Sequence, residues 1–490
     1  MSRLALRRLS PEFALTLLMI VWQGLILANR THLPTNYRLE ASTGLNRPIA
    51  LRFFYFYHHF GVFPVTLRGV PESLPMGFPP AEVLAKWGSG LRNDTIDPVA
   101  WGRLGDYARI YLFSPSVWIG APVENASVLP FHILLFILSL IAVIWAFARE
   151  GRLSQGAWLV VLIGSCSFQL YEVYGHENVF SLPISVALIT LALNLRFLVD
   201  RPSPLRSDFL IAFVSGIFLA SVYQLRTEPA MIALSLAPAY LFARGFTWAR
   251  RALLVTLFAA TFTLGSLGWK AHFTSMRADA IAFVKDHGGI PFTGSTETHH
   301  PIWHNVFIGL GDFGGDKGYE WEDNVAYAYA LPELRRTISP ELEQIASHFR
   351  LSSQPNAPYY FKPELMPEYS QIIRKKILSD ISSDPLWFAR IIFKRVKEIF
   401  LVSLPLQLNL IWITLTLPLG LWAVLPLAAG LAYRRRWFEL KIILFFAPMS
   451  LTALVIFSGR GTTLYQIAHL AALALVLGTL QLPRLNRKSV

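Results

Sequence analysis

The chain has 490 residues, of which 53% are hydrophobic and only 15% are charged, and its mean hydropathy is +0.43. This composition excludes a soluble globular protein, a disordered chain, a coiled coil and a disulfide-rich secreted scaffold. The single cysteine, Cys166, excludes an internal disulfide and a cysteine metal cluster. The 44 Lys and Arg residues outnumber the 31 Asp and Glu residues and give a net charge of +13. In a membrane protein this excess reflects topology and anionic lipid headgroups, and we find no nucleic-acid-binding module.

Apolar runs that can cross or nearly cross a bilayer recur along the chain, and they predict an all-α polytopic membrane protein with about ten transmembrane helices. The runs lie at about 13–29, 129–147, 157–173, 179–196, 209–225, 229–243, 252–270, 407–432, 440–457 and 463–482. The first run follows Arg3, Arg7 and Arg8 and has no small-residue cleavage site after it, so we expect an uncleaved signal anchor with its N-terminus inside.

The basic residues predict the orientation of these helices. With the N-terminus inside, every inner turn is rich in Arg and Lys, whereas the short outer turns hold only Arg226 and Arg460. This asymmetry is typical of the positive-inside rule and predicts that both termini are cytoplasmic. Two long segments, 30–128 and 271–406, then form large loops on the outer side.

The same pattern divides the chain into three parts. Residues 1–270 form an N-terminal transmembrane module of seven helices that includes the outer loop 30–128. Residues 271–406 form an outer-side loop domain, and residues 407–490 carry the last three helices. Near 384–400, aromatic and aliphatic residues alternate with Arg and Lys, which predicts a helix lying in the membrane interface.

Three short outer turns carry charged or titratable side chains that have little loop around them. His176 and Glu177 lie between the third and fourth helices, Arg226 and Glu228 between the fifth and sixth, and Arg460 lies between two glycines before the last helix. Charges so close to a bilayer pair with each other or hold a charged ligand, and a guanidinium between glycines suits a phosphate. The alternatives are an interfacial polar turn for the first and a snorkelling Arg for the last.

The first outer segment offers carboxylates close to the second helix. Asp106 and then Asp94 are our candidates for a general base, which must be an oriented carboxylate beside the reacting hydroxyl, and Glu40 is the reserve. The alternative for each Asp is a turn or helix cap, because its side chain bonds well to nearby backbone.

The second outer segment holds His300, Trp303 and His304, followed by the acidic residues Glu320 and Asp323. The spacing of these residues fits no defined zinc signature, so a divalent metal stays an alternative. We expect instead a loop folded over the cavity, in which these five side chains bind substrate by stacking and hydrogen bonds.

This layout resembles the GT-C superfamily, polytopic glycosyltransferases that use polyprenyl-phosphate sugars and include protein O-mannosyltransferases and aminoarabinose transferases. The resemblance covers residues 1 to about 270 and about 370 to 482. One feature that carries it is the long outer segment after the first helix. Tyr174–Phe180 is similar to the family's Tyr-x-x-Glu-x-x-Phe turn, and Gly216–Arg226 is similar to its Gly-x-x-x-Gly/Ala run ending in Arg. Asp384–Phe388 is similar to its pre-helix Asn/Asp-Pro-x-x-aromatic segment. The chain lacks the family's paired Asp-Glu after the first helix and its soluble C-terminal domain.

The resemblance implies inverting transfer of a sugar from a polyprenyl-phosphate donor to a hydroxyl of a glycan, lipid or protein on the periplasmic or luminal side. Asp106 or Asp94 would be the base, Arg226 and Arg460 would hold the donor phosphate, and the aromatic loop would contact the sugar. The resemblance also implies that the chain lies in a bacterial inner membrane, and it points to no definite cofactor. One alternative is an O-antigen ligase or polymerase, to which His304-Asn305 is similar. A lipid-linked-sugar transporter or flippase ranks third, because the predicted spans are nearly free of charge.

Overall fold

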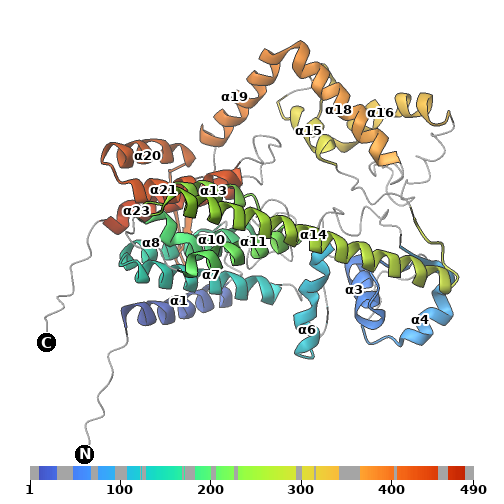
Figure 1. Cartoon of the computed structure of the whole chain (residues 1–490), viewed down its shortest axis with the longest axis horizontal. Coiled ribbons are helices and arrows are strands. Elements are labelled where there is room, and N and C mark those ends of the chain that lie inside the picture. Colours follow the sequence, from blue (N-terminus) through green and yellow to red (C-terminus); the bar gives the residue numbers. More distant parts are fainter. Residues whose placement is uncertain are drawn as a thin grey trace, which may run out of the picture.

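The computed structural model of the chain describes residues 10–29, 48–67, 76–93, 107–121, 123, 129–167, 170, 182–199, 206–225, 230–293, 301–313, 316–340, 365–401, 405–450 and 462–479. These residues are mostly helical. Figure 1 shows a bundle of helices from which one long helix, α14 (Trp248–Asp286), extends toward two further groups of helices.

Within the described part of the chain, four helices are long and apolar enough to cross a membrane, which fits a membrane protein. They are α1 (Pro11–Ala28), α7 (Leu129–Arg149), α11 (Ser207–Leu225) and α14. Shorter helices complete the bundle: α8 (Leu153–Ser165), α10 (Leu182–Leu198), α13 (Ala233–Leu241), α20 (Val424–Tyr433), α21 (Trp437–Phe446), the 3₁₀ helix η10 (Ala447–Ser450) and α23 (Thr462–Thr479).

Helix α1 shows how the bundle relates to its surroundings. Its apolar side chains Leu18 and Val21 are 67% and 60% exposed, whereas the polar Gln23 is buried and donates a hydrogen bond to the Gly164 carbonyl at 3.0 Å. A helix that turns its apolar side outward and its amide inward suits hydrocarbon, where only the polar group needs a protein partner.

Helices α11 and α14 pack closely along their length because small residues lie between them. A Cβ added at Gly216 would lie 1.9 Å from the Thr261 hydroxyl, and one added at Gly265 would lie 2.9 Å from the Ala220 Cβ. Small residues let transmembrane backbones approach closely. The contact therefore packs the first half of α14 against the bundle.

Basic turns meet at one end of the bundle. The buried Asp208 at the start of α11 lies 2.8 Å from Arg196 in α10 and 3.2 Å from Arg250 in α14. At the same end, the Lys441 ammonium in α21 donates to the Leu198 carbonyl at 3.3 Å. Among the described residues, the turns next to Arg196, Arg250 and Lys441, which the sequence assigned to one side, therefore lie together.

The apolar run 407–432 does not form the single helix that the sequence predicts. Strands β3 (Leu406–Asn409) and β4 (Thr414–Leu417) pair as an antiparallel hairpin, followed by the 3₁₀ helix η9 (Leu421–Ala423) and then α20. A second difference is that α14 continues to Asp286, so the predicted boundary at 270 falls inside a helix.

The first group beyond the bundle comes from the segment after α1. It contains α3 (Pro48–Phe60), β1 (Thr66–Leu67), α4 (Pro80–Trp87), the 3₁₀ helix η3 (Gly88–Gly90), β2 (Leu91–Arg92), the 3₁₀ helix η4 (Tyr107–Phe113) and α6 (Ser114–Trp118). Strands β1 and β2 are antiparallel. Tyr55 and Phe56 of α3 share an apolar core with Ala280 and Val284 of α14, which fixes this group on the far half of the long helix (Figure 1).

The second group, called here the α15–α19 unit, has its own apolar core around Phe307, Tyr319, Tyr369 and Ile373. Its elements are α15 (Ile302–Leu310), the 3₁₀ helix η7 (Asp316–Gly318), α16 (Asp323–Thr337), α18 (Met366–Ser383) and α19 (Pro385–Leu401). The stretch predicted as an interfacial helix is therefore helical.

Candidate functional site

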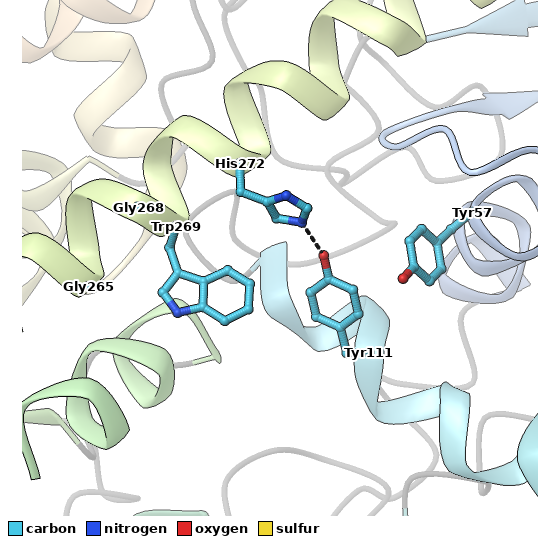
Figure 2. A pocket seen from close by; sticks show the side chains of 6 residues that line it. All are labelled: Tyr57, Tyr111, Gly265, Gly268, Trp269 and His272. Carbon is cyan, nitrogen blue, oxygen red and sulfur yellow. Dashed lines mark hydrogen bonds between the residues drawn. The ribbon is translucent and has the colours of Figure 1, made fainter. Parts of the chain in front are cut away.

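An open pocket of about 550 Å³ lies where α14 leaves the bundle and meets η4 and α3 (Figure 2). Its lining residues come from these three elements. They are Tyr57, Tyr111, Gly265, Gly268, Trp269 and His272.

One face of α14 forms the floor of the pocket, because residues three, four and seven apart share a helix face. A Cβ added at Gly268 would meet no atom within 4 Å, so this glycine opens space beside Trp269 and His272. The Trp269 indole donates to the Ser221 hydroxyl of α11 at 3.0 Å and stacks on Phe273 at 5.6 Å between ring centroids. These contacts hold the indole as a rigid wall.

Tyr111 brings a hydroxyl to the centre of the pocket. Its oxygen lies 2.7 Å from His272 Nε2, and its ring meets Tyr57 edge to face at 5.5 Å. Burial, with the neighbouring Tyr57, raises the pKa of Tyr111 to about 12. The phenol therefore stays protonated at physiological pH, and its hydroxyl shares a hydrogen bond with His272 Nε2.

This arrangement suits a ligand with both apolar faces and hydroxyl groups. The aromatic faces offer stacking surfaces, while Tyr111 and His272 supply a small number of fixed polar atoms. Among the residues that the structure describes, no Asp or Glu lines the pocket, and no group of three metal-ligating side chains occurs. The described lining residues can therefore bind and orient a ligand through aromatic faces and two polar atoms.

Most residues predicted for the site lie outside the described residues. They are Asp94, Asp106, His176, Glu177, Arg226, Glu228, His300 and Arg460. Two of them adjoin the site in sequence: Asp106 directly precedes η4, which carries Tyr111, and Arg226 directly follows α11, which carries Ser221.

The prediction that His304 belongs to a loop over the cavity is wrong. His304 lies within helix α15, which starts after Pro301, and its side chain has no exposed surface. Its Nδ1 is hydrogen-bonded to the Tyr369 hydroxyl, and its ring stacks on Tyr327 at 4.9 Å. His304 therefore belongs to the core of the α15–α19 unit.

The other predicted residues of this segment that the structure describes do not line the pocket either. Trp303 is half-buried, with the Arg374 guanidinium 5.6 Å from its ring. Glu320 is exposed at the surface, and Asp323 is the first residue of α16. None of these three residues lines the pocket.

Sequence reasoning did not identify the four side chains that do line it. Tyr57, Tyr111, Trp269 and His272 come from three separate elements and form no motif. The available signal was Trp269-x-x-His272, an aromatic and a titratable residue on one helix face at the end of an apolar run.

No protein-family model matches the chain, and no curated protein or solved structure does either.

Proposed function

We propose that the chain is an integral-membrane glycosyltransferase of the GT-C type that moves a sugar from a polyprenyl-phosphate donor to a hydroxyl acceptor. The observation that carries this proposal is the aromatic pocket at the junction of the apolar bundle and the helices beyond it. A lipid-linked sugar presents its ring just outside the hydrocarbon, so an aromatic wall with two polar atoms at that level matches its chemistry.

The proposed topology has ten crossings, cytoplasmic termini and the pocket at the outer interface of a bacterial inner membrane. The length of helix α14 supports placing the pocket at the outer interface. Arg250 lies at the end of the bundle where the basic turns meet, and His272 lies in the pocket. The 22 residue steps of helix from one to the other span roughly 33 Å. That length is close to the hydrocarbon thickness of a bilayer, about 30 Å.

In this proposal the sugar ring stacks against Trp269 and Tyr57, and Tyr111 and His272 hydrogen-bond its hydroxyl groups. Arg226 and Arg460 hold the donor phosphate. Tyr111 stays protonated because burial raises its pKa, so it serves as a donor and not as the base. The base is then a loop carboxylate, and Asp106 is the first choice because η4 follows it directly.

A transfer assay tests the pocket. The purified full chain in proteoliposomes is given a panel of radiolabelled polyprenyl-phosphate pentoses and hexoses together with a lipid and glycan extract that supplies hydroxyl acceptors, and release of polyprenyl phosphate is measured. We expect one of these donors to be consumed and Trp269→Leu to lower the rate of its consumption about tenfold, since an aromatic anchor in a binding site contributes more than 1 kcal/mol. Trp248→Leu is the matched control, because this Trp is 69% exposed at the other end of the same helix. Equal rates in the two variants, or no donor consumed, would contradict the proposal.

A second pair of variants tests the base. Asp106→Asn or Asp94→Asn keeps the shape of the side chain but removes its basic lone pair, so the correct one abolishes transfer and retains donor binding. Full activity in both Asn variants removes the two residues from this role and moves attention to Glu40.

A further inference from the structure

Helix α19 is anchored to the α15–α19 unit by one face. Trp387, Ile391 and Arg395 recur every four residues and are at most 5% exposed. Arg395 lies 3.3 Å from the Asp312 carboxylate and donates to the Gly309 carbonyl. This buried ion pair fixes the rotation of α19, because a charge with 1% of its surface exposed must keep its partner.

The opposite face of α19 is covered by no described part of the chain and mixes two kinds of side chain. Apolar residues are strongly exposed there, and exposed cations lie beside them at spacings of three and four. The apolar residues are Leu386 (73% exposed), Phe393 (69%) and Leu401 (63%), and the cations are Arg390, Lys394 and Lys397.

This face continues toward the apolar exterior of the bundle. The helix packs against η9, whose Trp422 is 44% exposed, and Leu425 of the following α20 is 56% exposed. Figure 1 shows α19 descending toward α20 at the edge of the bundle. An exposed apolar row that approaches lipid-facing side chains, with long cations beside it, has the chemistry of an interfacial helix on an anionic surface.

We propose that the exposed face of α19 binds the anionic phospholipid headgroups of the membrane that holds the bundle, and so holds the α15–α19 unit against the bilayer. Leu386, Phe393 and Leu401 enter the headgroup boundary, while Arg390, Lys394 and Lys397 pair with lipid phosphates. This inference is independent of the glycosyltransferase proposal, because it concerns where the unit lies and not what the pocket does.

Spin labels on the full chain test it. In a Cys166→Ala background, a nitroxide is attached at Phe393→Cys and, as the matched control, at the exposed Ser379→Cys on α18. Each protein is placed in nanodiscs of phosphatidylcholine alone or with phosphatidylglycerol. Accessibility to oxygen, which enriches in lipid, is compared with accessibility to a water-soluble nickel complex.

With phosphatidylglycerol, the label at 393 is expected to favour oxygen and the label at 379 the nickel complex. For the label at 393, the ratio of oxygen accessibility to nickel accessibility is compared between phosphatidylglycerol and phosphatidylcholine discs. The triple variant Arg390→Gln, Lys394→Gln, Lys397→Gln should reduce this difference between the two lipids about tenfold or more, since each cation near an anionic surface contributes separately. Circular dichroism of this variant checks that its helices are intact. A label at 393 that favours the nickel complex as strongly as the one at 379 would overturn the proposal. Protection from both reagents in both lipids would also overturn it, because that result indicates a protein partner.

Discussion

Tyr111 lies where its surroundings favour the neutral phenol, and this predicts a specific pH dependence. Its ordinary pKa of 10.0 is raised to about 12 in the fold, chiefly by burial. Between these values the folded chain binds more protons than the unfolded one, so the stabilisation from Tyr111 is complete below pH 10.0 and is lost as the pH rises through about 12. An ultraviolet difference titration of wild type minus Tyr111→Phe measures this phenol alone. A midpoint near 10 would show that the phenol is not buried as described.

Asp208 is the second residue with a sharp prediction. It is fully buried between Arg196 and Arg250, so Asp208→Asn leaves two guanidiniums without their carboxylate. We expect a loss of about 3 to 5 kcal/mol of stability, the usual effect of breaking a buried ion pair. Thermal unfolding in lipid nanodiscs measures it.

The control for Asp208 is Glu333→Gln, which removes an exposed ion pair with Arg336 on α16. Exposed pairs contribute little, so this variant should melt like wild type. Equal melting of the two variants would mean that the Asp208 cluster does not hold α10, α11 and α14 together.

The sequence predicted the residues of the candidate site less well than it predicted helices, for a physical reason. Tyr57, Tyr111 and His272 become neighbours only when α3, η4 and α14 pack, and no local pattern records that packing. His304 shows the opposite error: a polar residue in a run of aromatics suggested a ligand contact, but its partner is the hydroxyl of Tyr369, which lies far along the chain.

Among the elements, long apolar runs were the most predictable part of the fold. α1, α7 and α11 end within a few residues of the runs that predicted them, because hydropathy over a full crossing is a strong signal. The run 407–432 failed because averaging hid a period of two: Leu406-Gln407-Leu408-Asn409 and Thr414-Leu415-Thr416-Leu417 alternate as strands do. Helix α14 outlasts its apolar run because hydropathy falls after residue 270 while the residues still favour a helix.

The packing of α11 on α14 predicts different results at two glycines. In Gly216→Ala the new methyl meets the Thr261 hydroxyl and the Phe258 carbonyl, so we expect about 1 to 3 kcal/mol of destabilisation from overpacking. In Gly268→Ala nothing lies within 4 Å, so stability should hold or rise slightly while the methyl narrows the pocket. Melting temperature and donor consumption are measured for both. A Gly268→Ala protein that melts well below wild type would contradict the open space at this position.

At the scale of the whole molecule, the proposed topology makes a direct prediction. A membrane-impermeant maleimide added from outside should label Gly90→Cys and Glu320→Cys, which lie in the two long segments, and should not label Ser203→Cys. The native Cys166 is buried and gives little background. If position 203 is labelled in sealed cells while positions 90 and 320 are protected, the orientation is the reverse of the proposed one and the pocket lies on the inner side.

The proposal as a whole requires a lipid-linked sugar to occupy the pocket between α3, η4 and α14, and photocrosslinking measures this most directly. A polyprenyl-phosphate sugar with a diazirine on its ring is irradiated with the full chain in nanodiscs, and the modified peptides are identified by mass spectrometry. We predict modification within Tyr107–Phe113 or 265–276, suppressed by excess unmodified donor and weakened in Trp269→Leu. Modification confined to the basic turns 244–251 and 434–441 at the other end of the bundle would contradict the proposal. So would modification that excess unmodified donor does not suppress.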